Sequence, residues 1–250
     1  MPATSLHLRV LATRHLLQQG ARLLDRYFYF FMALLIPAIV VFGFSFTIVG
    51  NLIHPAVPRP LMLYVHAAVF SFWLVFFLLQ SILVRTRHVR WHRRVGWFGA
   101  GLGMLIPVLG TATAIVMARF NATQLHRSHV EADLIIPLWD MVAFTVTFAL
   151  AIGCRKRPEY HRRLVLAATC ALTAAAFGRF PAGLLSPTFF YAGVDVLLAC
   201  GAMRDWIVDR RIHPVYLCTL PVFILGQTSV MYANIHDLPY WLRIAHAMLQ

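Results

Sequence analysis

The sequence predicts an all-α protein, a polytopic transmembrane bundle of about seven spans, and three observations lead to that fold class. Hydrophobic residues make up 60% of the 250-residue chain. They gather into long apolar runs, each near the roughly 20 residues that a helix needs to cross the hydrocarbon core. Basic residues concentrate in every other connection between the runs. The predicted spans are Tyr27 to Gly50, Leu61 to Val84, Val95 to Ala118, Leu134 to Cys154, Leu164 to Leu184, Thr188 to Val208 and Pro214 to Asn234.

The basic residues also predict the orientation of the chain. Of its 22 Lys and Arg residues, 17 lie in segments 1–26, 85–94, 155–163 and 204–213, whereas the other loops and the carboxyl-terminal tail hold only four. Positively charged connections stay on the cytoplasmic side of a membrane. We therefore expect a cytoplasmic amino terminus, an external carboxyl terminus and multi-pass insertion in the inner (plasma) membrane of the cell.

The large positive charge predicts a lipid partner. A net charge of +13 would suggest nucleic acid in a soluble chain, but here the charge is divided among short loops between apolar runs. Such loops face anionic lipid headgroups at the cytoplasmic surface, so we expect no nucleic-acid partner. The longest polar stretch is the first 26 residues, which leaves no room for a soluble domain.

Two segments make up the predicted domain organisation. Residues 1–26 form an amphipathic basic helix on the cytoplasmic surface, or a helix that docks a partner, and residues 27–250 form the seven-span domain. The first apolar run ends without a small-residue cleavage pattern, so we expect it to be retained. The apolar stripe of the surface helix consists of Leu6, Val10, Leu17, Ala21 and Leu24.

A weak internal repeat marks two helix starts. The segment WHRRVG at 91–96 opens the third span, and YHRRLV at 160–165 opens the fifth. One interpretation is interfacial anchoring, because Trp and Tyr suit the headgroup layer and arginines reach phosphate. The other is that the repeat brings His92 and His161 together to ligate or flank a cofactor whose acidic groups the paired arginines neutralise.

Polar residues inside the predicted spans form a second constellation. His66, Asp140, Asp195, Arg179 and Gln227 lie at similar depths, about five to seven residues from the outer ends of their spans. Ionisable residues are costly in hydrocarbon and are candidates for function. We expect these five side chains to face one another in an outward-facing polar pocket.

Metal binding is one interpretation of this pocket. His66, Asp140 and Asp195 would supply one nitrogen and two oxygen ligands to zinc. His126 and His129, in the outer loop above the pocket, could complete or guard the site. A zinc-bound water would then hydrolyse a substrate at the outer leaflet.

Two further interpretations remain open. Haem b could lie between His66 and a second outer histidine such as His129, with Arg179 meeting a propionate. Alternatively the pocket is a structural network, in which Arg179 neutralises one aspartate and His66 hydrogen-bonds the other. Glycines on one face of the third span permit close contact with a neighbouring helix or a flat cofactor. These glycines are Gly96, Gly99, Gly103 and Gly110.

Several of these motifs together carry a resemblance. The histidine of span two, the HRR helix starts and the run DWIVDRRIHPVY at 205–216 resemble an uncharacterised family of bacterial multi-pass membrane proteins, of the domain-of-unknown-function type, over about residues 60–230. The chain is also similar, more faintly, to the cytochrome b561-like di-haem membrane proteins. That resemblance implies an outer haem ligand at His66 and inner ones at His92 and His161. The HRR starts are similar to those of small membrane proteins that assist haem–copper oxidase assembly.

Three functions are compatible with these features as hypotheses, and whether the chain is an enzyme stays open. The first is a haem-b-linked redox or oxidase-accessory protein. The second is a zinc-dependent membrane hydrolase that uses His66, Asp140 and Asp195. The third is a non-catalytic, transporter-like or scaffolding bundle. Each is compatible with a membrane-protein partner or a homo-oligomer.

Overall fold

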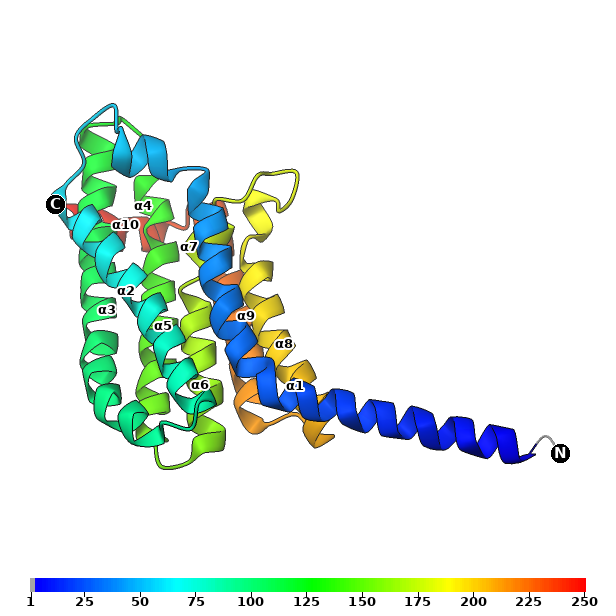
Figure 1. Cartoon of the computed structure of the whole chain (residues 1–250). Helices are drawn as coiled ribbons and strands as arrows, with labels where there is room; N and C mark the ends of the chain where they lie inside the picture. Colours follow the sequence, from blue (N-terminus) through cyan, green and yellow to red (C-terminus); the bar gives the residue numbers. More distant parts are fainter. Residues whose placement is uncertain (1–2) are drawn as a thin grey trace.

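The chain folds as a bundle of helices in the computed structural model, which describes residues 3–250 and the side chains of residues 18–250 (Figure 1). This described part contains no strand. The long helices are α1 (Ala3–Ser45), α2 (Leu61–Arg85), α3 (Val89–Thr123), α5 (Ile135–Gly153), α6 (Pro158–Ala171), α8 (Tyr191–Asp209), α9 (Pro214–Ile235) and α10 (Pro239–Leu249). Single turns form η1 (Val49–Ile53), α4 (Val130–Asp133), α7 (Ala174–Phe177) and η2 (Pro187–Phe189).

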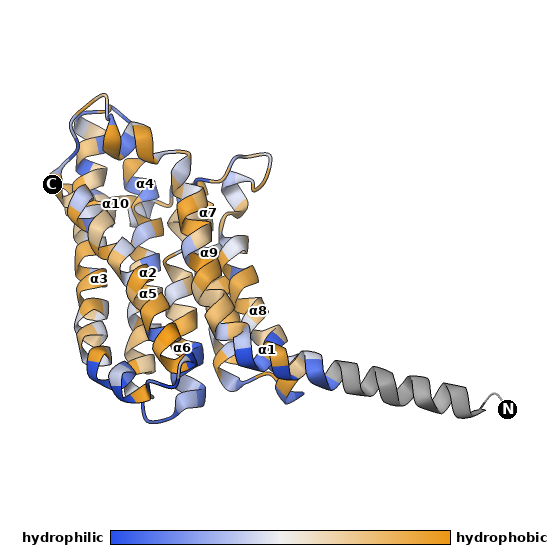
Figure 2. Ribbon diagram, viewed as in Figure 1, coloured by the Kyte–Doolittle hydropathy of each residue, from blue (hydrophilic) through white to orange (hydrophobic). Residues whose placement is uncertain are grey.

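The bundle is that of a helical membrane protein. Five of the described stretches are long and apolar enough to cross a bilayer, and they correspond to α1, α2, α3, α4 with α5, and α9. Large apolar side chains stay exposed on their outer faces, for example Val75, Met104 and Val108, each more than 60% exposed. Exposed apolar faces of this kind suit contact with lipid. The hydrophobic middle of the bundle is clear in Figure 2.

The predicted fifth span differs most from the structure. A continuous helix was expected to run to Leu184, but α6 ends at Ala171 and the single turn α7 comes after a break. At the break, the hydroxyl of Thr173 donates to the carbonyl oxygen of Cys170 at 2.6 Å. Pro181, soon after α7, has no N–H to continue a helix. The pair α6–α7 still runs between the two ends of the bundle, as α8 does (Figure 1).

The first helix also differs from expectation, because α1 is a single helix of 43 residues. The surface helix expected at 1–26 and the span expected from Tyr27 are therefore continuous. Pro37 lies inside this helix without ending it. Side chains of the amphipathic stripe up to Leu17 lie outside the described residues.

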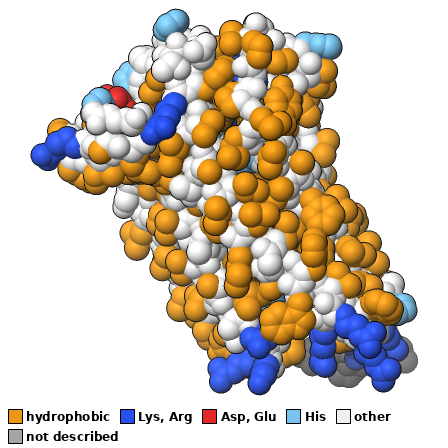
Figure 3. Space-filling model, turned by 90° about the vertical axis from the view of Figure 1, so that its left-hand side faces the viewer, with side chains coloured by type: hydrophobic (Ala, Val, Ile, Leu, Met, Phe, Trp, Pro, Cys, Tyr) orange, Lys and Arg blue, Asp and Glu red, His pale blue; other side chains and the backbone are white. Residues whose placement is uncertain are grey.

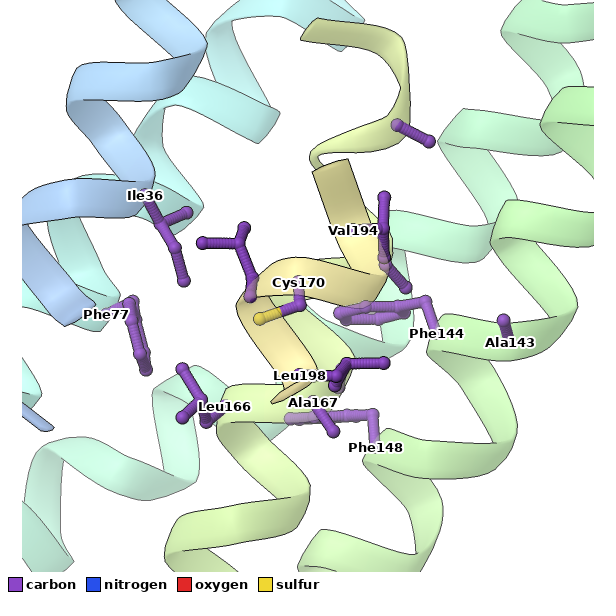
Figure 4. Close-up of a cluster of buried hydrophobic side chains, with 14 of the residues drawn as sticks. Ile36, Phe77, Ala143, Phe144, Phe148, Leu166, Ala167, Cys170, Val194 and Leu198 are labelled. Carbon is purple, nitrogen blue, oxygen red and sulfur yellow. The ribbon is translucent and has the colours of Figure 1, made fainter. Parts of the chain in front are cut away.

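The core lies where α6 packs against its neighbours. From Leu164 to Ala171 almost every residue of α6 is buried, and most of them are small, which lets α5, α8 and α1 approach closely. The aromatic rings of Phe144 and Phe148 stack on one another beside it, with centroids 5.4 Å apart. Figure 4 shows this cluster, to which α1, α2, α5, α6 and α8 all contribute.

Three of the four glycines noted on α3, all except Gly96, have the helix-packing role that their spacing permits. A Cβ atom added at Gly103 would collide with the ring of Phe148 on α5, and one at Gly99 with the ring of Phe76 on α2. Helix α3 therefore sits between α2 and α5 at a distance that only glycine allows at these positions.

Basic residues gather at one end of the bundle, as their spacing predicts. The connections α2–α3, α5–α6 and α8–α9 all lie at the lower end in Figure 2 and carry most of its hydrophilic residues. Figure 3 shows Lys and Arg side chains at the same end, below a face covered by apolar side chains. We call it the basic end.

Candidate functional site

Two histidines meet at the basic end. His92, in the first turn of α3, and His161, in the first turn of α6, have ring centroids 6.4 Å apart and ring planes at 71°. Both helices pack on α5, which positions the two rings near its carboxyl-terminal end. The HRR repeat thus brings its histidines together in space.

The hydrogen bond of His161 determines which nitrogen of its neutral ring carries the proton. Its Nδ1 atom lies 2.9 Å from the carbonyl oxygen of Ala151 on α5. A carbonyl only accepts, so Nδ1 carries the proton, and Nε2 of the neutral ring keeps a lone pair. The Nδ1 atom of His92 is buried and has no partner among the described residues. The pair therefore offers imidazole nitrogens that the protein itself does not use.

Arginines and aromatic rings surround this pair. Arg94 lies over the ring of Trp91, 5.6 Å from its centroid, and Arg155 lies over Trp97 at 5.4 Å. Arg93 and Arg94 are exposed beside His92. Aromatic rings and arginines are typical of the headgroup layer of a membrane, so the interfacial-anchor interpretation fits these neighbours equally well.

A buried ion-pair lattice lies on the other side of α6. Arg163 is 1% exposed and donates through Nε and Nη2 to both oxygens of Asp205 on α8, at 2.8 and 2.7 Å. It also donates to Glu159 at 2.7 Å and to Asp209 at 3.2 Å. Two parallel bonds between guanidinium and carboxylate are the strongest arrangement for such a pair.

Arg204 extends the lattice to a third helix. It donates to Asp205 at 2.8 Å and to Asp209 at 2.6 Å, and it pairs with Asp25 of α1. The lattice therefore ties α1, α6 and α8 together at the basic end. Sequence reasoning missed it because Arg163 was interpreted as a lipid anchor. The available signal was the spacing of Asp205 and Asp209, one helical turn apart and both able to face an arginine.

His213 borders this lattice and caps α9. Its ring Nδ1 atom accepts a hydrogen bond from the backbone N–H of Val215 at 3.2 Å. The backbone N–H of His213 donates to the carboxylate of Asp205 at 3.3 Å. Burial and the charge of Arg163 lower the pKa of His213 from its ordinary value of 6.5. Partial burial raises the pKa of Glu159, but hydrogen bonding to Arg163 and the charge of Arg162 outweigh it and hold the pKa below 4.5.

The two in-span aspartates have neutral partners. Tyr191 of α8 donates to Asp140 of α5 at 2.9 Å. One turn along α8, Asp195 accepts from the Gln227 amide, which is oriented with its nitrogen 2.9 and 3.2 Å from the two carboxylate oxygens. Asp140–Tyr191 and Asp195–Gln227 are thus two hydrogen-bonded pairs that join α8 to α5 and to α9, and we call these four residues the polar chain. Tyr191 lay outside the predicted constellation, since tyrosine is common at span ends.

His66 and Arg179 lie apart from this chain. The ring of His66 stacks on Phe70 with centroids 3.9 Å apart, and its Nδ1 atom is buried without a partner in the described chain. Arg179 lies over the ring of Phe44 at 4.2 Å and donates to the carbonyl of Ala175. The expected bonds from Arg179 and His66 to an aspartate are not formed. The break after α6 explains the first of these, because it changes the direction in which Arg179 points.

The loop between α3 and α4, with α4 itself, contacts the carboxyl-terminal part of the chain. His129 lies 3.6 Å from Asp237, which precedes α10. The indole N–H of Trp241 donates to the backbone carbonyl of Glu131, and the Glu131 carboxylate lies 3.1 Å from His246, so α10 packs over this segment. The five predicted zinc ligands do not converge. Within residues 18–250, no three His, Cys, Asp or Glu side chains are grouped so that they could hold a metal ion. The residues concerned are His66, Asp140, Asp195, His126 and His129.

Comparisons with models of protein families, with curated proteins and with solved structures gave no match.

Proposed function

We propose that this chain is a seven-span redox protein that binds haem b between His92 and His161. The observation that carries the proposal is the 6.4 Å separation of the two ring centroids. A metal–nitrogen bond of about 2 Å on each side, plus about 1.1 Å from nitrogen to ring centre, separates two imidazoles that share one metal by about 6 Å. The observed spacing agrees with that value.

The surroundings of the pair support the same proposal. The bond to Ala151 holds His161 in the tautomer with a free Nε2, as the second-shell partner of a ligating histidine does. One turn along α3 from His92, an added Cβ at Gly96 would meet no atom within 4 Å, so the helix surface is open at that position. The exposed Arg93 and Arg94 would meet the propionates. Bound haem would supply one-electron exchange.

Haem fits the ligand count of the pair better than zinc does. His92 and His161 would suffice as the protein ligands of a haem iron, whereas a zinc site uses three or four protein ligands. The outer alternative has weaker support, because His129 is 65% exposed and faces Asp237.

The proposal includes an orientation. The basic end faces the cytoplasm and its anionic lipid headgroups, and the chain lies in the inner membrane of a bacterium with its carboxyl terminus outside. The haem would then lie near the cytoplasmic surface, where a soluble electron donor could reach it.

An absorption spectrum of the detergent-purified protein tests the proposal. We expect a Soret band and one haem per chain when the protein is produced with excess haem. His92→Gln and His161→Gln should each lose the band while the protein still inserts. His88→Gln is the matched control, since His88 lies at the same end and contacts Thr86. No Soret band in the unsubstituted protein, or loss of the band in the control alone, would refute haem binding by this pair.

A second candidate, a transporter-like bundle, is supported by the polar chain of Asp140, Tyr191, Asp195 and Gln227. Buried carboxyl groups inside membrane bundles mark proton or ion pathways. Proteoliposomes with an imposed pH gradient test this candidate, and we expect Asp195→Asn to abolish any proton flux that the unsubstituted protein supports.

A further inference from the structure

A cleft of about 1120 Å³ opens at the basic end, between α1, α6, α8 and the turn into α9. It lies on the opposite side of α6 from the ring of His92, and neither His92 nor His161 lines it. Four arginines dominate its charged lining, together with three carboxylates of the ion-pair lattice. The arginines are Arg162, Arg163, Arg204 and Arg211.

The floor of the cleft consists of Arg163 and Arg204, whose guanidinium groups are held in place by the ion-pair lattice. Arg163 uses Nε, Nη1 and Nη2 in bonds to Glu159, Asp205 and Asp209. Arg204, which is 2% exposed, uses both terminal nitrogens in the same way. Side chains held on several sides present their remaining donors in a fixed direction.

Two buried donors of the cleft remain unused. The Nε atoms of Arg204 and Arg162 are both buried and have no partner among the described residues. At the rim, Arg211 is exposed and forms no ion pair within the described chain. A guanidinium only donates, so a group that satisfies these three side chains must present acceptors.

The charge balance restricts that group further. With Asp205 beneath the floor, four carboxylates offset the four arginines of the cleft, so each negative charge that a ligand brings must be stabilised by hydrogen-bond donors rather than by net charge, and a singly charged group costs the least. A phosphodiester carries one negative charge spread over two free oxygens, which matches several guanidinium donors. Ile212 and Pro214 add an apolar edge to the lining, suited to the chains of a lipid.

We propose that this cleft binds a singly charged phosphate group through Arg162, Arg204 and Arg211. A phospholipid headgroup and free phosphate share this chemistry. This site is independent of the proposed haem site, because neither His92 nor His161 lines the cleft.

Thermal unfolding of the purified full chain in an uncharged detergent tests the site, because a ligand that binds only the folded state raises Tm in a saturable manner. The probes are short-chain phosphatidylglycerol, inorganic phosphate and short-chain diacylglycerol. We expect phosphatidylglycerol to raise Tm and diacylglycerol to leave it unchanged. An equal rise with inorganic phosphate would support the site and assign it to a soluble anion.

Two variants locate the effect. Arg211→Gln should raise the half-saturation concentration about tenfold, the size expected for the loss of one charge-assisted hydrogen bond. Arg162→Lys, which keeps the charge but lacks Nε, should also weaken binding. Arg210→Gln is the matched control, because Arg210 is adjacent and exposed but lines a neighbouring groove between α1 and α8. Equal weakening by Arg210→Gln and Arg211→Gln, or no Tm shift with either phosphate probe, would overturn the proposal.

Discussion

Arg163 and Asp205 form a bidentate ion pair at 2.8 and 2.7 Å, although they are 42 residues apart and both side chains are at most 1% exposed. A pair this deeply buried is costly to desolvate, so each member depends on the other. The pair joins α6 to α8, and Arg204 adds α1 through Asp25. Three helices are therefore held together at the basic end by two arginines and the carboxylates of Asp205 and Asp25.

Removing one member of the pair should be strongly destabilising. Arg163→Met should lower the free energy of unfolding by about 3–5 kcal/mol, because Asp205 loses its bidentate partner in a buried site. Adding Asp205→Leu should recover part of that loss, and denaturant unfolding in mixed micelles measures both. Arg162→Met is the control, with an expected loss of at most about 1 kcal/mol, since its pair with Glu159 is exposed. Similar losses for Arg162 and Arg163 would contradict the lattice.

The stability of the protein should depend on the hydroxyl of Tyr191, which belongs to the polar chain. Tyr191→Phe leaves the carboxyl of Asp140 without its partner, so we expect a loss of about 1–3 kcal/mol in the free energy of unfolding. Tyr232→Phe, on the exposed side of α9, should be neutral. An Asp140→Leu background should remove most of the Tyr191 effect, and full additivity of the two changes would show that they do not interact.

The number of membrane crossings can be tested at the loop between α7 and α8. If α6–α7 and α8 both cross the bilayer, Ser186→Cys should react with a membrane-impermeant maleimide added outside intact cells. Arg157→Cys, in the α5–α6 connection, should react only after the membrane is permeabilised. The unsubstituted chain, whose four cysteines are free, gives the background. Labelling of Arg157→Cys from outside would reverse the proposed orientation.

Acid should weaken the start of α9. The pKa of His213 lies below 6.5 in the folded protein, so the unfolded chain binds a proton first and the free energy of unfolding falls as pH drops below about 6.5. Above that pH the residue contributes no pH dependence. His213→Asn keeps a cap for Val215 without titrating. It should flatten this part of the stability profile, measured by thermal unfolding between pH 7 and 5, and an unchanged slope would exclude the cap as its source.

The sequence predicted the helices and the charged end well, because both depend on local composition. Long apolar runs and clustered arginines need no knowledge of tertiary contacts. Side-chain partners were harder to predict, since each residue turns a helix by about 100° and any break changes the direction of every later side chain. The break after Ala171 does this for Arg179. Asp195 and Gln227 do lie in contact, as expected from their similar depth, because no break in α8 or α9 changes the direction of either side chain.

The lattice between α6 and α8 also bears on how the chain enters a membrane during synthesis. Alone, α6 would leave Arg163 and α8 would leave Asp205 without its buried partner, and neither helix is among the described stretches that are long and apolar enough to cross a membrane. When α6 and α8 lie side by side, Arg163 and Asp205 neutralise one another. Helix α6 therefore gains the partner of its buried charge only after the chain has been synthesised as far as α8, 42 residues later.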